Sequence, residues 1–158
     1  SLARGATSLT KLVLNGNRLG PEGVDALAQA LQGSANSLKD LYITSCSLDG
    51  AEGGRAVALL SSTSPGLEML VLEDNEFRQA GMRALVRGLP AITQFKEVFL
   101  CTAGLEGRGA GKATAALARK APGLEKLVLG GNHRFGPAGL QALAQGLGEG
   151  SRLKDIGL

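Results

Sequence analysis

The stretch Leu9-Thr-Lys-Leu12-Val-Leu14-Asn-Gly-Asn17-Arg-Leu19 decides how this chain folds, because its pattern returns along the whole sequence. The copies start at Leu9, Leu38, Leu67, Phe95, Leu124 and Leu153, so that successive starts are 29, 29, 28, 29 and 29 residues apart. A fixed period of this length is typical of repeat proteins, in which each repeat buries its apolar face against its neighbours. The sequence therefore predicts a repeat array without a single central core.

Within each repeat, the apolar spacing changes from the period of a strand to that of a helix. Leu9, Leu12 and Leu14 open the repeat with the alternation of a short strand. Val24, Leu27 and Leu31 then lie at i, i+3 and i+7, which predicts a helix with Pro21 in its first turn. The equivalent helical residues are Met82, Leu85 and Leu89; Leu140, Leu143 and Leu147; and, smaller, Gly53, Ala56 and Leu60; Ala110, Ala113 and Leu117.

The type of residue at the ninth position of the motif, in the turn after each strand, alternates along the array. Asn17, Asn75 and Asn132 hold this position in the odd repeats, whereas Cys46 and Ala103 hold it in the even ones. A buried asparagine can pair with backbone groups of the turn, because its amide both donates and accepts. We therefore expect backbone groups near Ala103 to lack a side-chain partner, and Ala103→Asn to stabilise the protein by about 1 kcal/mol.

This alternation of Asn and Cys resembles the ribonuclease-inhibitor-like leucine-rich repeats. That family includes ribonuclease inhibitor, the Ran GTPase-activating protein and the repeat arrays of NOD-like receptors. The resemblance implies an α/β solenoid shaped as a horseshoe, with a parallel β-sheet on the concave face and parallel helices on the convex face. Ala103 departs from the pattern, as does the extra residue in Asn132-His-Arg-Phe135.

The repeat starts predict one array over residues 1–158, with about five complete repeats that begin near residues 9, 38, 67, 95 and 124. Partial repeats are expected at each end. Terminal repeats of a solenoid normally have polar caps, and neither end shows one. We therefore expect the chain to be a segment of a longer one.

Composition argues against several classes of partner and location. The net charge of +3 arises from 17 basic and 14 acidic residues that are interspersed, and aromatic residues are few, so nucleic acid is not an expected partner. No apolar run approaches the 18 or so residues that span a bilayer. Cys46 and Cys101 lie in different repeats and no signal peptide is visible, which favours an intracellular, cytoplasmic location.

No pattern predicts catalysis or a bound cofactor or metal. The stretch from Gly107 to Lys112 resembles a phosphate-binding loop, but the motif needs glycine at Glu106 and serine or threonine at Ala113. The single histidine, His133, has no cluster of ligating residues around it in the sequence. The chain is therefore predicted to be no enzyme, with no catalytic, cofactor or metal site.

Two rows of residues on the predicted strands are more informative. In the five complete repeats the fifth position of the motif is apolar or aromatic, and it faces away from the helices, which suggests a partner-binding stripe roughly 19 Å long: Val13, Tyr42, Val71, Phe99 and Val128. Strand propensity alone is the alternative explanation. The second position predicts a ladder of opposite charges: Thr10, Lys39, Glu68, Lys96, Glu125 and Lys154.

These observations give two hypotheses of function. The first is a non-enzymatic scaffold for protein–protein interaction along the concave face, within a receptor array or a larger assembly. The alternative is a GTPase-activating regulator resembling the Ran GTPase-activating protein. No catalytic residue of that family can be assigned to a position in this sequence.

Overall fold

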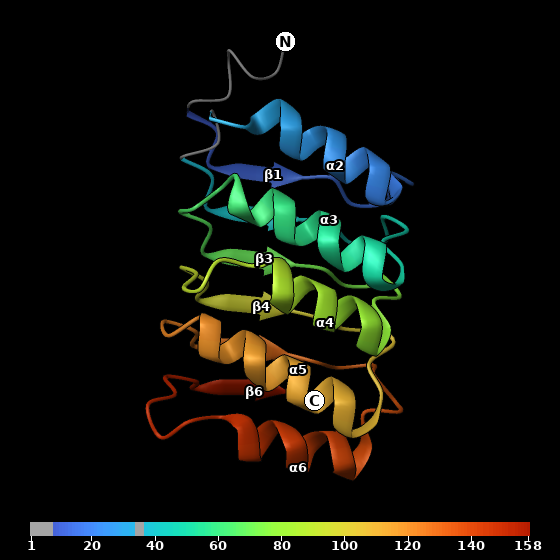
Figure 1. Ribbon diagram of the computed structural model, residues 1–158, viewed down its shortest axis with the longest axis vertical. Helices are drawn as coiled ribbons and strands as arrows, with labels where there is room; N and C mark the ends of the chain where they lie inside the picture. The colour runs from blue at the N-terminus through green and yellow to red at the C-terminus, as the bar shows by residue number, and fades with distance from the viewer. Residues whose placement is uncertain (1–7, 34–36) are drawn as a thin grey trace.

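The computed structural model describes residues 8–33 and 37–158, which form six strands and five helices in alternation (Figure 1). The strands are β1 Lys11–Val13, β2 Asp40–Tyr42, β3 Met69–Val71, β4 Glu97–Phe99, β5 Lys126–Val128 and β6 Asp155–Gly157. The helices are α2 Gly20–Leu31, α3 Gly50–Ser62, α4 Arg78–Gly88, α5 Gly107–Lys120 and α6 Gly136–Gly146. The predicted partial repeat before Leu9 falls largely outside the described residues.

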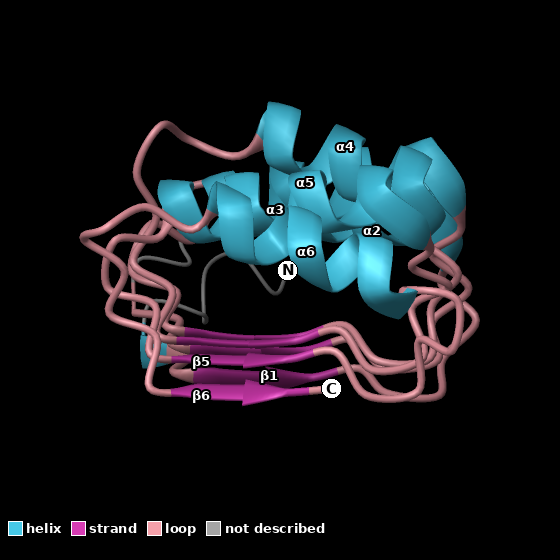
Figure 2. Ribbon diagram, turned by 90° about the horizontal axis from the view of Figure 1, so that it is seen from below, coloured by secondary structure: helices cyan, strands magenta, loops and turns pink. Residues whose placement is uncertain are grey.

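All six strands lie in one parallel sheet in the order β1-β2-β3-β4-β5-β6. The helices cover one face of this sheet, and no described helix or strand covers the other face (Figure 2). Each strand begins its repeat and is followed by a helix that returns the chain to the next strand, as right-handed parallel crossovers require. The α/β solenoid expected from the sequence is confirmed.

The core lies between the sheet and the helices. In β2 the inward side chain of Leu41 is fully buried, whereas Asp40 and Tyr42 on either side of it are only partly buried. The helical stripes predicted for the second, third and fourth repeats are buried as expected. In the first and fifth repeats, Leu27 and Leu147 are partly buried. Leu140 is 42 % exposed, because no described helix packs on the far side of α6.

The helices approach one another in pairs through glycine. A Cβ atom on Gly54 of α3 would lie 2.0 Å from the carbonyl oxygen of Gly81 in α4. A Cβ atom on Gly111 of α5 would lie 2.1 Å from the carbonyl oxygen of Gly139 in α6. Only glycine allows backbones to pack this closely, so α3 pairs with α4 and α5 pairs with α6.

Asn75 and Asn132, the asparagines of the third and fifth repeats, each join their repeat to the preceding one. The Asn75 side chain is buried, and its Oδ1 accepts hydrogen bonds from the backbone N–H groups of Cys46 at 2.9 Å and Leu48 at 3.2 Å. Its Nδ2 donates to the carbonyl oxygens of Ile43 and Leu72, at 2.6 and 3.1 Å. One side chain thus satisfies turns in its own repeat and in the preceding one, as the expectation for asparagine required.

The expectation that backbone groups near Ala103 lack a side-chain partner is wrong, because an asparagine also bonds to the turn of the preceding repeat. The N–H groups of Ala103 and Leu105 donate to Oδ1 of Asn132, at 2.9 and 3.0 Å, so the following repeat supplies the missing partner. Asn132 also donates to the carbonyl oxygen of Leu100 at 2.8 Å. An even repeat therefore needs no asparagine of its own.

The expected effect of Ala103→Asn changes sign as a result. Ala103 is fully buried, so the larger amide would enter a filled space in which the adjacent N–H groups are already bonded. We expect a loss of about 2 kcal/mol in the free energy of unfolding, measured by chemical denaturation. Ala103→Cys introduces the thiol that Cys46 supplies in the second repeat. It should change the free energy of unfolding by less than about 1 kcal/mol. Stabilisation by asparagine would contradict this account.

Candidate protein-binding face

The side chains at the fifth position of the motif form a continuous row across the sheet. The strand register places Val13 beside Tyr42, Tyr42 beside Val71, Val71 beside Phe99 and Phe99 beside Val128. All five stand on the face of the sheet that the helices do not cover, as the sequence predicted. We call this row the concave stripe: Val13, Tyr42, Val71, Phe99 and Val128.

The concave stripe is less exposed than the sequence suggested. Val13 is 53 % exposed, but Val71 is only 7 % exposed, and the other three members are half-buried. Val71 stands between the two aromatic rings, which shield it from solvent. The aromatic members thus cover part of the row while keeping part of their own surface open.

Both aromatic rings also contact a lysine. The Lys11 ammonium lies 4.6 Å from the centre of the Tyr42 ring, and that of Lys126 lies 5.8 Å from the centre of the Phe99 ring. The Tyr42 hydroxyl lies 3.0 Å from Sδ of Met69 and donates a weak hydrogen bond to it. An ammonium attracts the negative face of an aromatic ring and remains hydrated at the surface. The rings are therefore held in defined positions.

The predicted ladder of charges is present beside the stripe. The Lys39 and Lys96 ammonium groups lie 2.9 and 2.5 Å from the two carboxylate oxygens of Glu68. Lys154 contacts Glu125 at 3.0 Å. The Lys96 ammonium, followed by that of Lys39, lowers the pKa of Glu68 from 4.5 to about 2. The ladder links neighbouring strands at the edge of the sheet where they begin.

Glu68 should make folding depend on acidity in a defined range. Its pKa is lower in the folded protein, so its stabilising contribution is complete above pH 4.5 and is lost as the pH falls towards about 2. We expect Glu68→Gln to be less stable than the parent protein at neutral pH and equally stable near pH 2, in denaturation curves across this range. Glu22→Gln is the control, because Glu22 makes no ion pair among the described residues. A constant difference for Glu68→Gln at every pH would refute the ladder's contribution.

The comparisons with known proteins agree with this architecture. A family model described as Leucine Rich repeat matches residues 5–28 and 122–144. The chain is 33 % identical to a ribonuclease inhibitor of Sus scrofa over 170 residues, which cover 100 % of this chain and 36 % of that protein. It is 29 % identical to a ribonuclease inhibitor of Mus musculus over 147 residues, which cover 92 % of this chain and 32 % of that protein.

These are leucine-rich repeats of the ribonuclease-inhibitor-like type. The chain spans about a third of the length of the relatives that it matches. A solved structure of leiomodin-1 actin-binding site 2 has the same fold, with a TM-score of 0.63 at 14 % identity, over 94 % of this chain and 84 % of that one.

Across residues 8–33 and 37–158, no three His, Cys, Asp or Glu side chains gather closely enough to bind a metal ion. His133 is exposed in its loop, and Gly107 begins helix α5. Burial raises the pKa values of the Cys46 and Cys101 thiols, which disfavours reactive thiolates. No helix among the described residues has the length and apolarity needed to cross a membrane.

A pocket at the loop edge of the repeats was not predicted from the sequence. It lies where the turns after β3, β4 and β5 meet, and its volume is about 600 Å³. Its charges are largely paired, since Arg134 lies 3.6 Å from Glu106 and Arg78 contacts Glu76. The residues come from three repeats, so nothing in the spacing within one repeat could reveal the pocket.

Proposed function

We propose that this chain is a non-enzymatic scaffold that binds another protein through the concave stripe and the lysines beside it. The carrying observation is the row of half-buried aromatic and aliphatic side chains on the face of the sheet opposite the core. Aromatic side chains that are held in place and partly exposed commonly dominate the energetics of protein interfaces. Each ring also contacts one lysine, and Lys126 is in turn paired with Asp155 at 3.1 Å, so the apolar contacts lie among charges of both signs.

The relatives support recognition of a protein rather than of a small molecule. Two of them are named as inhibitors of ribonuclease, and the structural neighbour is named as an actin-binding site. These names describe those proteins. They favour an interaction role for a chain with the same kind of repeat. We also propose an intracellular setting, because both cysteines are free thiols and one of them is buried.

Replacing the aromatic members of the stripe tests this proposal. We expect Tyr42→Ala and Phe99→Ala each to weaken partner binding by more than about 1 kcal/mol, while they change stability by at most about 1 kcal/mol. Titration with the native partner and thermal melts give the two quantities. Leu59→Ala on the helical face is the control, because Leu59 is 42 % exposed and lies outside the stripe, so binding should be unchanged. If both aromatic variants bound the partner normally, the proposal would be contradicted, and strand propensity would explain why these residue types occur in the row.

The finer role is a receptor array or an assembly subunit, with a GTPase-activating regulator as the alternative. One simple assay separates the two scaffold roles from the regulator. The chain is added to a panel of small GTPases, and the rate of GTP hydrolysis is measured. The scaffold hypothesis predicts no acceleration, whereas an acceleration of about tenfold, equivalent to about 1.4 kcal/mol of transition-state stabilisation, would favour the regulator.

A further inference from the structure

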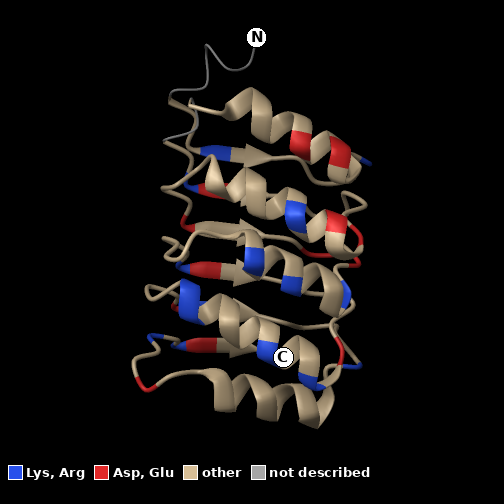
Figure 3. Cartoon of the chain, in the orientation of Figure 1, with Lys and Arg blue, Asp and Glu red and all other residues tan. Residues whose placement is uncertain are grey.

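Charge is segregated along the helical face, although it is interspersed in the sequence. Helix α4 has three basic residues and no acidic one, and α5 has four basic residues and no acidic one. Helix α2 has only Glu22 and Asp25 as charged residues, and α6 has no charged residue. Figure 3 shows the resulting pattern, with blue concentrated on α4 and α5, red on α2, and both colours near the start of α3.

A groove of about 580 Å³ separates α4 from α5 at the centre of this basic region. The helices on either side are drawn together in the pairs α3–α4 and α5–α6 by glycine contacts. Between α4 and α5 there is a side chain where those pairs have backbone contact: a Cβ on Gly109 would lie nearest to atoms of the Gln79 side chain. Val86, Ala113 and Ala116 supply apolar lining, so the groove is shallow and has an aliphatic surface.

Four cations line the groove, two from each helix. Arg83 and Arg87 are one turn apart on α4, and Arg108 and Lys112 are one turn apart on α5. Like charges at this spacing repel one another and destabilise a helix slightly. All four side chains belong to exposed residues, and none forms an ion pair within the described part of the chain.

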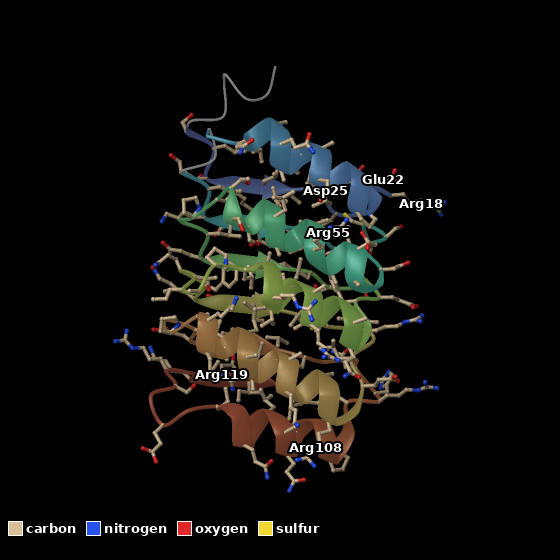
Figure 4. All side chains as sticks on the ribbon, viewed as in Figure 1. Arg18, Glu22, Asp25, Arg55, Arg108 and Arg119 are labelled. Carbon is tan, nitrogen blue, oxygen red and sulfur yellow. The ribbon has the colours of Figure 1, made fainter. Side chains whose placement is uncertain are left out.

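Other helical cations are neutralised or anchored. Arg55 on α3 lies 2.5 Å from Glu52 and 4.0 Å from Asp25, beside which it appears in Figure 4. Arg119, also labelled there, donates to the carbonyl oxygen of Gly146 at 2.6 Å, and Lys120 donates to that of Leu89 at 2.6 Å. The four groove cations differ from these three, because within the described part of the chain none of them has a carboxylate or a carbonyl oxygen as a partner.

We propose that the α4–α5 groove binds an acidic peptide segment of a partner protein. Carboxylates of the segment would pair with the arginines and lysine on the two walls, and its aliphatic side chains would contact Val86 and Ala116. Arginine presents two parallel donors to a carboxylate, and three of the four cations are arginine. The groove lining contains no aromatic side chain on which a base could stack, which favours a peptide over single-stranded nucleic acid. This surface is on the opposite side of the molecule from the concave stripe and does not depend on it.

Fluorescence anisotropy with defined probes tests this proposal. The probes are a short labelled peptide that alternates glutamate with leucine, and a labelled single-stranded RNA, each titrated with the full chain at constant ionic strength. We expect the peptide to bind, and Arg87→Glu/Lys112→Glu to weaken its binding at least about tenfold, because reversed charges repel the carboxylates. The control Arg18→Glu/Arg152→Glu changes the net charge equally but replaces exposed cations outside the groove, and it should retain most of the affinity.

The remaining variants separate the groove from general attraction between opposite charges. Ala116→Gln adds a polar side chain to the groove without changing any charge, and it should weaken peptide binding at least about threefold. Tyr42→Ala/Phe99→Ala should bind the peptide normally, so that failure of the concave-stripe proposal would leave this one intact. Failure of the peptide to bind, equal losses in the two charge-reversed proteins, or tighter binding of RNA than of the peptide would each overturn the proposal.

Discussion

Asn75→Ala should lower the free energy of unfolding by about 3 kcal/mol. The amide accepts hydrogen bonds from two backbone N–H groups of the second repeat and donates to carbonyl groups in the second and third. Asn75 is only 1 % exposed, so water cannot easily replace these bonds in the intact protein. Each buried polar group left without a partner costs about 1–3 kcal/mol. Equilibrium denaturation with urea measures the loss.

Asn17→Ala is the matched control for this prediction. Asn17 has the same place in the first repeat, but it is exposed, and among the described residues its amide donates only to the carbonyl oxygens of Leu14 and Asn15. Its replacement should therefore cost less than about 1 kcal/mol. Asn132→Ala should fall between the two, because Asn132 is half-buried and joins the fourth and fifth repeats. Equal losses at the three positions would contradict the role of burial and of bonding between repeats.

Gly54→Val should also destabilise the protein by about 3 kcal/mol. A Cβ atom at this position would lie 2.0 Å from the carbonyl oxygen of Gly81 and 2.8 Å from its carbonyl carbon. Backbone atoms cannot rotate away as a side chain can, so α3 and α4 would have to separate along their contact. Overpacking of this kind typically costs about 1–3 kcal/mol, and the cost is highest where the neighbour is rigid. Urea denaturation again provides the measurement.

Gly23→Ala in α2 controls for the loss of a helical glycine. The nearest atom to a Cβ at Gly23 would be Cβ of Leu19, at 3.1 Å, which is a side-chain atom. Alanine favours a helix over glycine by about 1 kcal/mol, so this variant should be unchanged or slightly more stable. If Gly54→Val were as stable as the parent protein, α3 and α4 could not be in direct backbone contact.

The repeat and its two faces could be predicted because they depend on residues close together in the sequence. The alternation of Leu9, Leu12 and Leu14, and the helical spacing of Val24 and Leu31, each involve neighbours within one element. The fixed period then places equivalent residues side by side, which is why the concave stripe and the Lys39–Glu68–Lys96 ladder were visible before the structure.

The features that were missed depend on contacts between repeats. Ala103 seemed to lack a partner because the amide that serves it, Asn132, is in the next repeat. The burial of Val71 results from rings on both neighbouring strands. The groove between α4 and α5 likewise appears only when two helices from different repeats are placed side by side. Period and composition do not measure how closely neighbouring repeats approach.

Site-directed photo-crosslinking tests the central claim most directly, namely that a protein partner binds the concave stripe. A photoreactive phenylalanine analogue replaces Phe99 or Val13 on the concave face, or Leu59 on the helical face, which is 42 % exposed. The chain is then irradiated with its native partner bound. The account predicts crosslinks to the partner from positions 99 and 13 and none from position 59. Crosslinks from position 59 alone would contradict it.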